Sequence, residues 1–331
     1  MTVSRAKVFH IAFCVDENYF RAMGATIVSI IENNPDQAFM FHVLTFAASE
    51  AHQSRLKQLD EKFPQVRTRL HLLDTADFRQ FDDFIKFSYY SLSIFTRLVI
   101  PTVLQELTDR VLYMDADILC VGKLDELVEM DIGDDIAAAV MDVPKMVKRR
   151  VAALGLTHRE YFNSGVMFIN IRKWQEHRIT EATMDALLRY GKKLRFPDQD
   201  ALNIIFNGRM RYLPIRYNRI YDLIDDLGNR ITAMRPVGNA VLLHFAGSIK
   251  PWADWTGHDA SRLFRQYHAL SPWSYLPLDQ QPGNTKEMRM HSRFLFRQGK
   301  PLQSLAWYLR YMRARSRKKS ASSEPTATHE S

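Results

Sequence analysis

The chain has 331 residues, 46% of them hydrophobic, which suffices for a folded protein with one large domain and an appendage or with two domains. The formal charge is +8, but residues 288–319 hold ten basic and no acidic side chains, so the remaining chain is near neutral. Two cysteines, Cys14 and Cys120, lie in apolar runs, which argues against a disulfide framework and favours a reducing cytosol. The first apolar run, 8–15, leads into Asp16 and Glu17 without a small-residue cleavage site, so we do not expect a signal peptide. No apolar run approaches the roughly 18 residues of a membrane span.

The first 140 residues alternate strand-like and helix-like patterns. We expect strands at 8–15, 40–46 and 69–73 and helices at 20–32, 49–62 and 91–98, with Ser49 as an N-cap. This βαβ order favours a right-handed, mostly parallel sheet.

The continuously apolar segment 111–114 predicts a strand that is buried on both faces of the sheet. Further strands are expected at 136–141, 166–171 and 241–243, and further helices at 176–190, 200–206, 285–298 and 301–317. We therefore divide the chain into an α/β domain (1–256), an aromatic and basic helical extension (257–319) and a polar, disordered tail (320–331).

Two aspartates separated by one residue follow the segment 111–114. Residues two apart in an extended backbone point to the same side, so Asp115 and Asp117 are expected to meet just beyond the strand. At about 5 Å and an effective dielectric near 20, their charges repel by roughly 3 kcal/mol. A divalent cation or a shared proton would offset this repulsion, and a solvated pair in a loop is the alternative.

Four other segments place polar groups where strands end or helices begin. Residues 16–19 could meet a base or a ribose, although a capping turn is the simpler explanation. Residues 161–165 provide an amide and a glycine at the sheet edge, or else a β-bulge. Residues 198–200 lead into a predicted helix. Asp198 either belongs to a functional site or caps the helix N-terminus, and Asp200 places a favourable negative charge in its first turn.

The fourth segment, 244–252, begins where the strand 241–243 ends. His244 is either a hydrogen-bonded core residue or, together with the two aspartates, a ligand in a mixed nitrogen and oxygen site that suits manganese better than calcium. Lys250 would then neutralise a phosphate beside the metal, and Gly247 would let the backbone approach it.

Together these segments resemble glycosyltransferase family eight. The resemblance covers about residues 8–255 and rests on DENY (16–19), the arginine of SIFTRL (Arg97), YMDAD (113–117), YFNSGVMFIN, PDQDALN and HFAGSIKPW, in matching order and spacing. The tail, with KPWADW, SPW and a basic helical end, is similar to the lipopolysaccharide core hexosyltransferases of that family, bacterial enzymes that act on the cytoplasmic face of the inner membrane.

The resemblance implies a GT-A fold, a Rossmann-like α/β fold with a mixed, mostly parallel sheet, followed here by the helical basic extension. It also implies a UDP-glucose or UDP-galactose donor, a lipopolysaccharide core acceptor, and retention of the anomeric configuration. The implied cofactor is Mn²⁺, or else Mg²⁺.

The resemblance also assigns roles to individual residues. The metal ligands would be Asp115, Asp117 and His244. The nucleotide and its diphosphate would contact Cys14, Asp16, Asn18, Tyr19, Asp115, Ala116, Asp117, Gly247 and Lys250. The donor sugar would contact Arg97, Asp142, Asn163, Asp198 and Gln199, of which Asp198 and Gln199 are the catalytic candidates, either as a nucleophile or in an internal return.

Two other functions share parts of this pattern. A sugar-nucleotide-binding protein without turnover would use the same residues. A phosphohydrolase of the haloacid dehalogenase type also has Asp-x-Asp after an apolar strand, but the roughly fifteen residues between Asp117 and Gly133 are too few for its βα units, and Leu119 stands where it needs a hydroxyl.

The C-terminal stretch 301–319 predicts a basic amphipathic helix, with Leu302, Leu305, Leu309 and Met312 on one face. Such a helix binds anionic membrane surfaces, which would hold the protein on the inner face of the bacterial inner membrane. A helix packed on the core is the alternative. No RNA-binding motif accompanies the basic residues, so nucleic acid is not expected as a partner.

Overall fold

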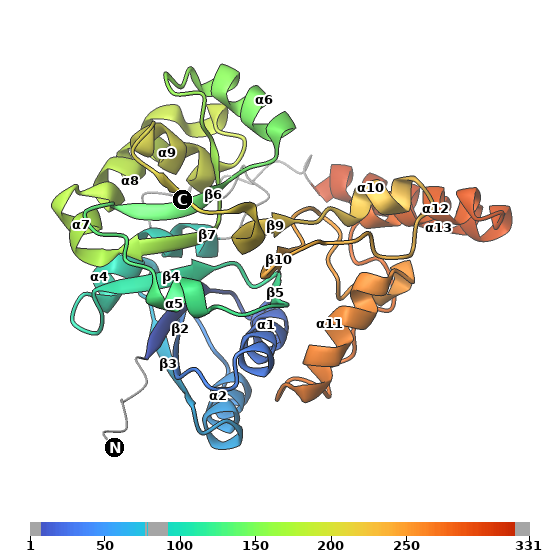
Figure 1. Cartoon of the computed structure of the whole chain (residues 1–331). Helices are drawn as coiled ribbons and strands as arrows, with labels where there is room; N and C mark the ends of the chain where they lie inside the picture. Colours follow the sequence, from blue (N-terminus) through green and yellow to red (C-terminus); the bar gives the residue numbers. More distant parts are fainter. Residues whose placement is uncertain (1–7, 77, 79–91, 322–331) are drawn as a thin grey trace, which may run out of the picture. The chain divides into compact units, whose positions relative to one another are not determined.

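A seven-stranded sheet forms the centre of the first part of the chain in the computed structural model, which describes residues 8–76, 78 and 92–321 (Figure 1). In spatial order, its strands are β3 (Val66–Leu72), β2 (Phe39–Thr45), β1 (Phe9–Cys14), β4 (Arg110–Met114), β7 (Phe162–Asn170), β6 (Ala137–Met141) and β8 (Arg211–Tyr212). Strand β7 is antiparallel to β4 and β6, and the other neighbouring pairs are parallel. The prediction of a mixed, mostly parallel sheet is confirmed.

The two helices predicted between the first three strands are present. Helices α1 (Phe20–Asn33) and α2 (Glu50–Lys62) connect β1, β2 and β3, and the side chain of Ser49 caps α2 by accepting the backbone N–H of His52. This part also contains η2 (Leu92–Val99), α4 (Ile100–Leu104), α5 (Asp125–Glu129), α6 (Pro144–Leu154), α7 (Ile171–Glu176), α8 (Ile179–Tyr190), η3 (Gly191–Lys193), α9 (Pro197–Phe206) and η4 (Ile215–Asn218).

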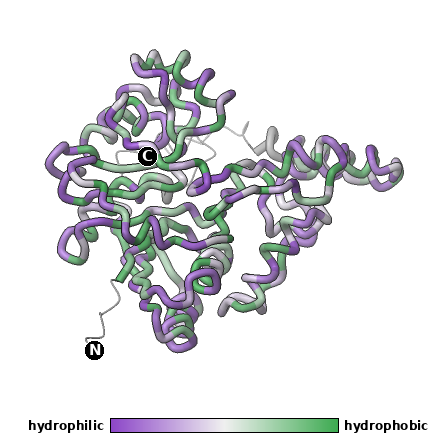
Figure 2. The backbone as a smooth tube through the Cα atoms, viewed as in Figure 1, coloured by the Kyte–Doolittle hydropathy of each residue, from purple (hydrophilic) through white to green (hydrophobic). Residues whose placement is uncertain are grey.

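Strand β4 is buried on both faces, as its continuously apolar sequence predicts. Val111, Leu112 and Met114 have no exposed surface, and Tyr113 has 1%. Figure 2 shows the central strands as mainly hydrophobic segments of the tube. The densely packed sheet therefore holds the residue that follows β4, Asp115, in a defined position.

A second, three-stranded sheet brings a distant segment beside the paired aspartates. It consists of β5 (Ile118–Cys120), β10 (Leu242–His244) and β9 (Arg219–Ile220). Strand β10 is antiparallel to β5, with His244 opposite Ile118, and parallel to β9. This register places His244 next to the residue that follows Asp117.

The predicted start of strand β7 and the predicted start of the helix that follows it are both wrong. Strand β7 begins at Phe162 rather than at residue 166, because Phe162 and Asn163 continue the ladder with Met141 and Val140 of β6 across a register shift. The alternative of a β-bulge at 161–165 corresponds to this irregularity, which lies inside the strand. The expected helix 176–190 begins at Ile179, because Arg178 adopts a left-handed conformation (φ 49°) that separates α8 from the short helix α7.

Two helix predictions also need correction. Helix α9 begins at Pro197 with Phe196 at the N-cap, so Asp198 lies in the first turn and does not cap the helix. The carboxylate of Asp200 accepts the backbone N–H groups of Arg195 and Phe196 instead. The helix expected at 91–98 is a 3-10 helix from Leu92 onward, and residue 91 lies outside the described residues.

The chain divides into two compact units: residues 1–221, 237–244 and 267–276 form the first, and residues 222–236, 245–266 and 277–331 form the second. The second unit contains α10 (Leu223–Gly228), η5 (Asp254–Thr256), most of α11 (Asp259–Leu270), α12 (Thr285–Arg297) and α13 (Pro301–Ala321). Ser292 of α12 and Ser304 of α13 exchange hydrogen bonds through their hydroxyl and carbonyl groups (2.9 and 2.7 Å).

Both C-terminal helices begin where the sequence predicts, and α13 extends beyond residue 317 to Ala321. The predicted disordered tail lies outside the described residues from 322 onward. No helix among the described residues combines the length and apolar character needed to cross a bilayer.

Candidate active site

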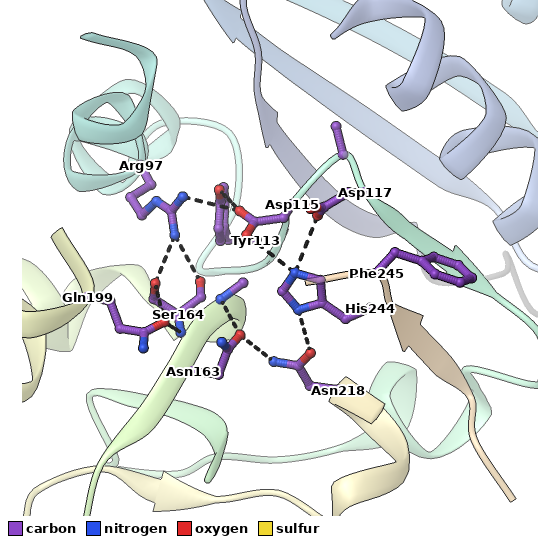
Figure 3. A network of polar contacts seen from close by, with 12 residues as sticks. Arg97, Tyr113, Asp115, Asp117, Asn163, Ser164, Gln199, Asn218, His244 and Phe245 are labelled. Carbon is purple, nitrogen blue, oxygen red and sulfur yellow. Dashed lines mark hydrogen bonds and ion pairs between the residues drawn. The ribbon is translucent and has the colours of Figure 1, made fainter. Parts of the chain in front are cut away.

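Three potential metal ligands meet where β4 ends, β5 begins and β10 ends (Figure 3). The Nε2 atom of His244 lies 3.3 Å from Oδ1 of Asp117 and 3.8 Å from Oδ2 of Asp115. One ligand atom of each residue lies within 4.8 Å of the others, and no other group of three such residues is found in the described part of the chain. The distant histidine and the paired aspartates therefore form one cluster.

A chain of hydrogen bonds orients the His244 ring. Its Nδ1 atom lies 2.8 Å from Oδ1 of Asn218, and Nδ2 of Asn218 donates to Oδ1 of Asn163 (2.9 Å). The amide oxygen of Asn218 is thus the acceptor for the imidazole, and the network assigns the ring proton to Nδ1. The Nε2 atom then presents its lone pair toward the two carboxylates, which is the form that binds a metal.

The cluster fits a divalent metal ion. Two carboxylates and a neutral imidazole form a mixed oxygen and nitrogen donor set of the kind that manganese accepts. Gly165 of β7 passes close to two of the ligands, since a Cβ atom there would lie 2.4 Å from Cε1 of His244 and 2.8 Å from Oδ2 of Asp115. A larger residue at this position would displace the ligands.

Arg97 connects the metal cluster to the start of α9. Its NH2 group lies 3.1 Å from Oδ1 of Asp115, and its Nε lies 3.1 Å from Oδ2 of Asp198. Its NH1 group donates to the hydroxyl (2.9 Å) and the carbonyl (3.2 Å) of Ser164. Arg97 is buried, and its guanidinium lies over the Tyr113 ring. Its positive charge therefore offsets the negative charges of Asp115 and Asp198 where water solvates them poorly.

Gln199 and Asp142 form the other side of the same network. Nε2 of Gln199 donates to Oδ2 of Asp142 (3.1 Å) and to the hydroxyl of Tyr161 (3.0 Å), while its Oε1 accepts the backbone N–H of Ser164 (3.0 Å). Nδ2 of Asn163 also donates to Oδ2 of Asp142 (3.4 Å). The structure thus brings together the predicted donor-sugar residues, which are Arg97, Asp142, Asn163, Asp198 and Gln199.

Burial raises the pKa of two carboxyl groups in this network. Burial raises the pKa of Asp198 although Arg97 acts in the opposite direction, and it raises the pKa of Asp142 although the backbone N–H of Val143 stabilises the charged form. Carboxyl groups with raised pKa values cluster at functional sites more often than elsewhere, because such sites are desolvated.

The predicted nucleotide residues that follow β1 form a turn. Oδ1 of Asp16 accepts the backbone N–H of Asn18 (2.9 Å), and its carbonyl accepts that of Tyr19 (3.0 Å). Tyr19 is 37% exposed and is the N-cap residue of α1, without a side-chain hydrogen bond to the helix. Cys14 ends β1, and burial raises the pKa of its thiol to about 12, so the thiol stays protonated.

Two further predicted residues, Gly247 and Lys250, belong to the second compact unit. Gly247 has φ +122°, which favours glycine, and a Cβ atom there would lie 2.9 Å from Oδ1 of Asp222. Nζ of Lys250 donates to the carbonyl of Phe245 (3.2 Å). Their contacts with a diphosphate stay predictions.

The sequence interpretation missed three residues that support the site. Asn218 orients His244, the Tyr113 hydroxyl donates to Asp115, and Ser164 contacts both Arg97 and Gln199. Tyr113 and Ser164 lie inside the quoted motifs, where their polar groups were a signal. Asn218 had no such signal, because it lies in a short 3-10 turn far from the other site residues in sequence.

Comparison with known proteins gives one consistent family. The profile described as Glycosyl transferase family 8 matches residues 10–256, and the profile Glycosyl transferase family 8 C-terminal matches residues 260–315. The chain is 33% identical over 278 residues to a lipopolysaccharide 1,2-glucosyltransferase of Escherichia coli, an alignment that covers 82% of this chain and 81% of the relative.

A second relative and a solved structure agree with this result. The chain is 29% identical over 318 residues to a lipopolysaccharide 1,3-galactosyltransferase of Salmonella typhimurium, covering 94% of this chain and 92% of the relative. The galactosyltransferase LgtC, solved in complex with donor and acceptor sugar analogs, matches with a TM-score of 0.63 and 25% identity over 80% of this chain and 96% of its own.

Proposed function

The chain belongs to glycosyl transferase family 8, and from this membership we propose that it transfers glucose or galactose from a UDP-sugar to a sugar of the lipopolysaccharide core, with retention of the anomeric configuration. The family match and the likeness to LgtC confirm the predicted glycosyltransferase with a GT-A fold and exclude the phosphohydrolase alternative. The names of the two bacterial relatives support the hexose and the acceptor class.

One observation carries the proposal most directly. The candidate metal cluster is continuous with the donor-sugar network, because Arg97 contacts Asp115 on one side and Asp198 on the other. A sugar diphosphate needs a cation-binding group next to a set of groups that hold a sugar. This arrangement supplies both in one place.

We propose Mn²⁺, or else Mg²⁺, as the metal held by Asp115, Asp117 and His244. When bound, it would neutralise the donor diphosphate and so favour its departure as the leaving group. Asn218 accepts the Nδ1 proton of His244, so the neutral ring offers the lone pair of Nε2 to this ion. The donor set and the imidazole tautomer support this assignment.

The catalytic candidates Asp198 and Gln199 already have polar partners. Oδ2 of Asp198 contacts Nε of Arg97, and Oε1 of Gln199 accepts the N–H of Ser164. A carboxylate that attacks the anomeric carbon would have to leave its ion pair in a buried setting, which is costly. We therefore favour an internal return on the same face of the sugar, with Asp198 and Gln199 orienting it.

The remaining assignments complete the donor site. We propose that the uridine contacts Asp16 and Tyr19, with Cys14 and Asn18 beside them, and that the backbone at Ala116 and the residues Gly247 and Lys250 approach the diphosphate. In this proposal, residues 1–256 form the catalytic domain and residues 257–319 the helical extension.

We also propose that α13 binds the anionic inner face of the bacterial inner membrane. Leu302 is 83% exposed, and Leu305, Leu309 and Met312 are 55%, 49% and 43% exposed, so the apolar face of the helix is available rather than packed on a core. Arg310 stacks over Trp307 (4.5 Å) beside this face. Flotation with phosphatidylglycerol vesicles should be lost on removal of residues 301–331, and undiminished flotation would end this part of the proposal.

The activity is tested by measuring UDP release and hexose transfer with UDP-glucose and UDP-galactose, in Mn²⁺ and in EDTA. We expect release with one of the donors in Mn²⁺ and none in EDTA, and loss of release in Asp117→Ala. Donor binding without any release under any metal would favour a sugar-nucleotide-binding protein instead. Structural analysis of the lipopolysaccharide from a deletion strain would identify the acceptor sugar.

A further inference from the structure

An open groove of about 490 Å³ lies along α6 in the first compact unit. The end of β6 and one face of α6 line it, with Met141, Val147 and Val151 as apolar residues, Lys148 and Arg159 as basic residues, and Asp142 at one wall. Neither the metal cluster nor any predicted nucleotide contact uses the groove. Its mixed lining suits a ligand that has both an apolar face and a charged group.

The apolar part of the groove is accessible. Met141 is 39% exposed, and Val147 and Val151 are half-buried one helical turn apart, so they form a continuous strip along α6. Sugar rings present C–H faces that pack on such strips, while their hydroxyl groups reach polar neighbours. A saccharide therefore matches this surface better than a purely polar ion does.

The segment around the groove is strongly basic. Residues 143–159 contain five lysines and arginines and no acidic residue. The guanidinium of Arg150 is occupied by the buried carboxylate of Asp200 (2.5 Å). The other four, Lys145, Lys148, Arg149 and Arg159, are exposed, and none forms an ion pair with any residue that the structure describes. The groove lining holds Lys148 and Arg159 against one acid, Asp142, and this excess of positive charge attracts an anionic ligand.

The groove is continuous with the donor-sugar network through Asp142. Oδ2 of this residue accepts hydrogen bonds from Gln199 and Asn163, while the residue itself lines the groove. A molecule in the groove therefore lies next to the groups proposed to hold the transferred hexose. An acceptor must occupy such a position for its hydroxyl to reach the donor sugar.

We propose that the α6 groove binds the acceptor saccharide, with a sugar face on Met141, Val147 and Val151 and an anionic substituent, phosphate or carboxylate, at Lys148 and Arg159. This inference rests on the proposed function and adds that the acceptor is recognised by its negative charge. The groove would thereby select charged oligosaccharides over neutral ones of similar size.

The test uses the full chain with Lys148→Gln/Arg159→Gln and a matched control, Lys57→Gln/Arg189→Gln, which removes two exposed positive charges elsewhere. Calorimetry measures binding of phosphorylated core oligosaccharide, and kinetics measures its KM. We expect the groove variant to weaken binding and raise KM about tenfold or more, with UDP release from donor alone unchanged, and the control to behave like the unmodified protein.

Dephosphorylated and carboxyl-reduced oligosaccharides show which anionic group is recognised. The recognised group is the one whose removal weakens binding to the unmodified protein as much as the groove substitutions weaken binding of the intact oligosaccharide. Equal oligosaccharide binding by the groove variant and the unmodified protein would overturn the inference, whether or not the donor turns over. Reduced flotation of the groove variant with phosphatidylglycerol vesicles at unchanged oligosaccharide affinity would overturn it too, in favour of a lipid site.

Absence of UDP release from any donor, with charge-dependent oligosaccharide binding intact, would contradict the proposed function alone.

Discussion

The Nε atom of Arg97 lies 3.1 Å from Oδ2 of Asp198, and both side chains are about nine-tenths buried. The same guanidinium reaches Asp115, so one cation joins a proposed metal ligand to a proposed catalytic residue. Arg97 therefore links the acid that follows β4 to the acid in the first turn of α9.

We expect Asp198→Asn to abolish detectable transfer and to lower the free energy of unfolding by about 3 kcal/mol, because it leaves a buried guanidinium with one partner fewer. The double variant Arg97→Gln/Asp198→Asn should be no more stable than Asp198→Asn and should also be inactive, because it removes the cationic partner of Asp115 as well. Urea unfolding and UDP release measure the two effects. Arg172→Gln, which breaks an exposed pair with Glu176, serves as control and should cost under about 1 kcal/mol.

Gly165→Ala should weaken metal binding strongly. The added Cβ atom would overlap Cε1 of His244 and Oδ2 of Asp115, and both belong to the interior of the cluster. Titration of Mn²⁺ followed by electron paramagnetic resonance measures the affinity. Gly283→Ala is the matched control, since the nearest atom to its Cβ would be 3.9 Å away, and it should bind Mn²⁺ normally. Unchanged affinity in Gly165→Ala would show that the ion lies elsewhere.

Asn218 should act as a positioning residue for His244. Asn218→Leu removes the acceptor of the Nδ1 proton, and loss of such a partner typically costs about 10- to 100-fold in metal affinity. Asn218→Asp keeps an acceptor for this proton but cannot donate to Oδ1 of Asn163, so it should recover only part of the affinity. The dependence of UDP release on Mn²⁺ concentration separates this effect from a general loss of folded protein. Equal metal dependence in both variants would argue against the assignment.

The indole of Trp273 should stabilise the turn that follows β1. Its Nε1 donates to Nδ1 of His52 (2.9 Å), whose Nε2 lies 3.2 Å from Oε2 of Glu17 in that turn. Trp273→Phe would leave the buried His52 nitrogen with fewer partners, at a cost of about 1–3 kcal/mol. We expect a lower melting temperature and a higher KM for the UDP-sugar at nearly constant kcat. A fall in kcat at unchanged KM would contradict this role.

Acid should destabilise the fold through a row of histidines on β1, β2 and β3. His42 is buried, its Nε2 lies 2.9 Å from Nδ1 of His10, and its Nδ1 lies 3.1 Å from Nε2 of His71. Burial, followed by the charges of His10, His71 and Arg69, lowers the pKa of His42 from 6.5 to about 3. The unfolded chain therefore takes up this proton first as the pH falls, and stability decreases from about pH 6.5 toward pH 3.

Between pH 6.5 and pH 5 this single group should remove about 2 kcal/mol from the free energy of unfolding. His42→Val should flatten that part of the pH profile, whereas His177→Gln, at an exposed position, should leave it unchanged. Urea unfolding at pH 7.5 and pH 5.0 provides the comparison. An identical pH slope in His42→Val and the unmodified protein would rule out His42 as the source.

Local sequence was sufficient for much of the fold and for the first half of the metal cluster. The alternation of strands and helices, the Ser49 cap and the buried strand before Asp115 follow from hydrophobic periodicity and capping chemistry, which depend on neighbouring residues alone. The spacing of Asp115 and Asp117 likewise follows from the two-residue period of an extended chain.

Tertiary structure decided the rest. His244 reaches the two aspartates because β10 pairs with β5, and Asn218 reaches His244 from a turn that carries no local signature. The start of β7 depends on its pairing with β6, and the groove along α6 exists because this helix lies beside Asp142. Contacts between segments far apart in the chain depend on packing and strand register, which the periodicity of one segment does not encode.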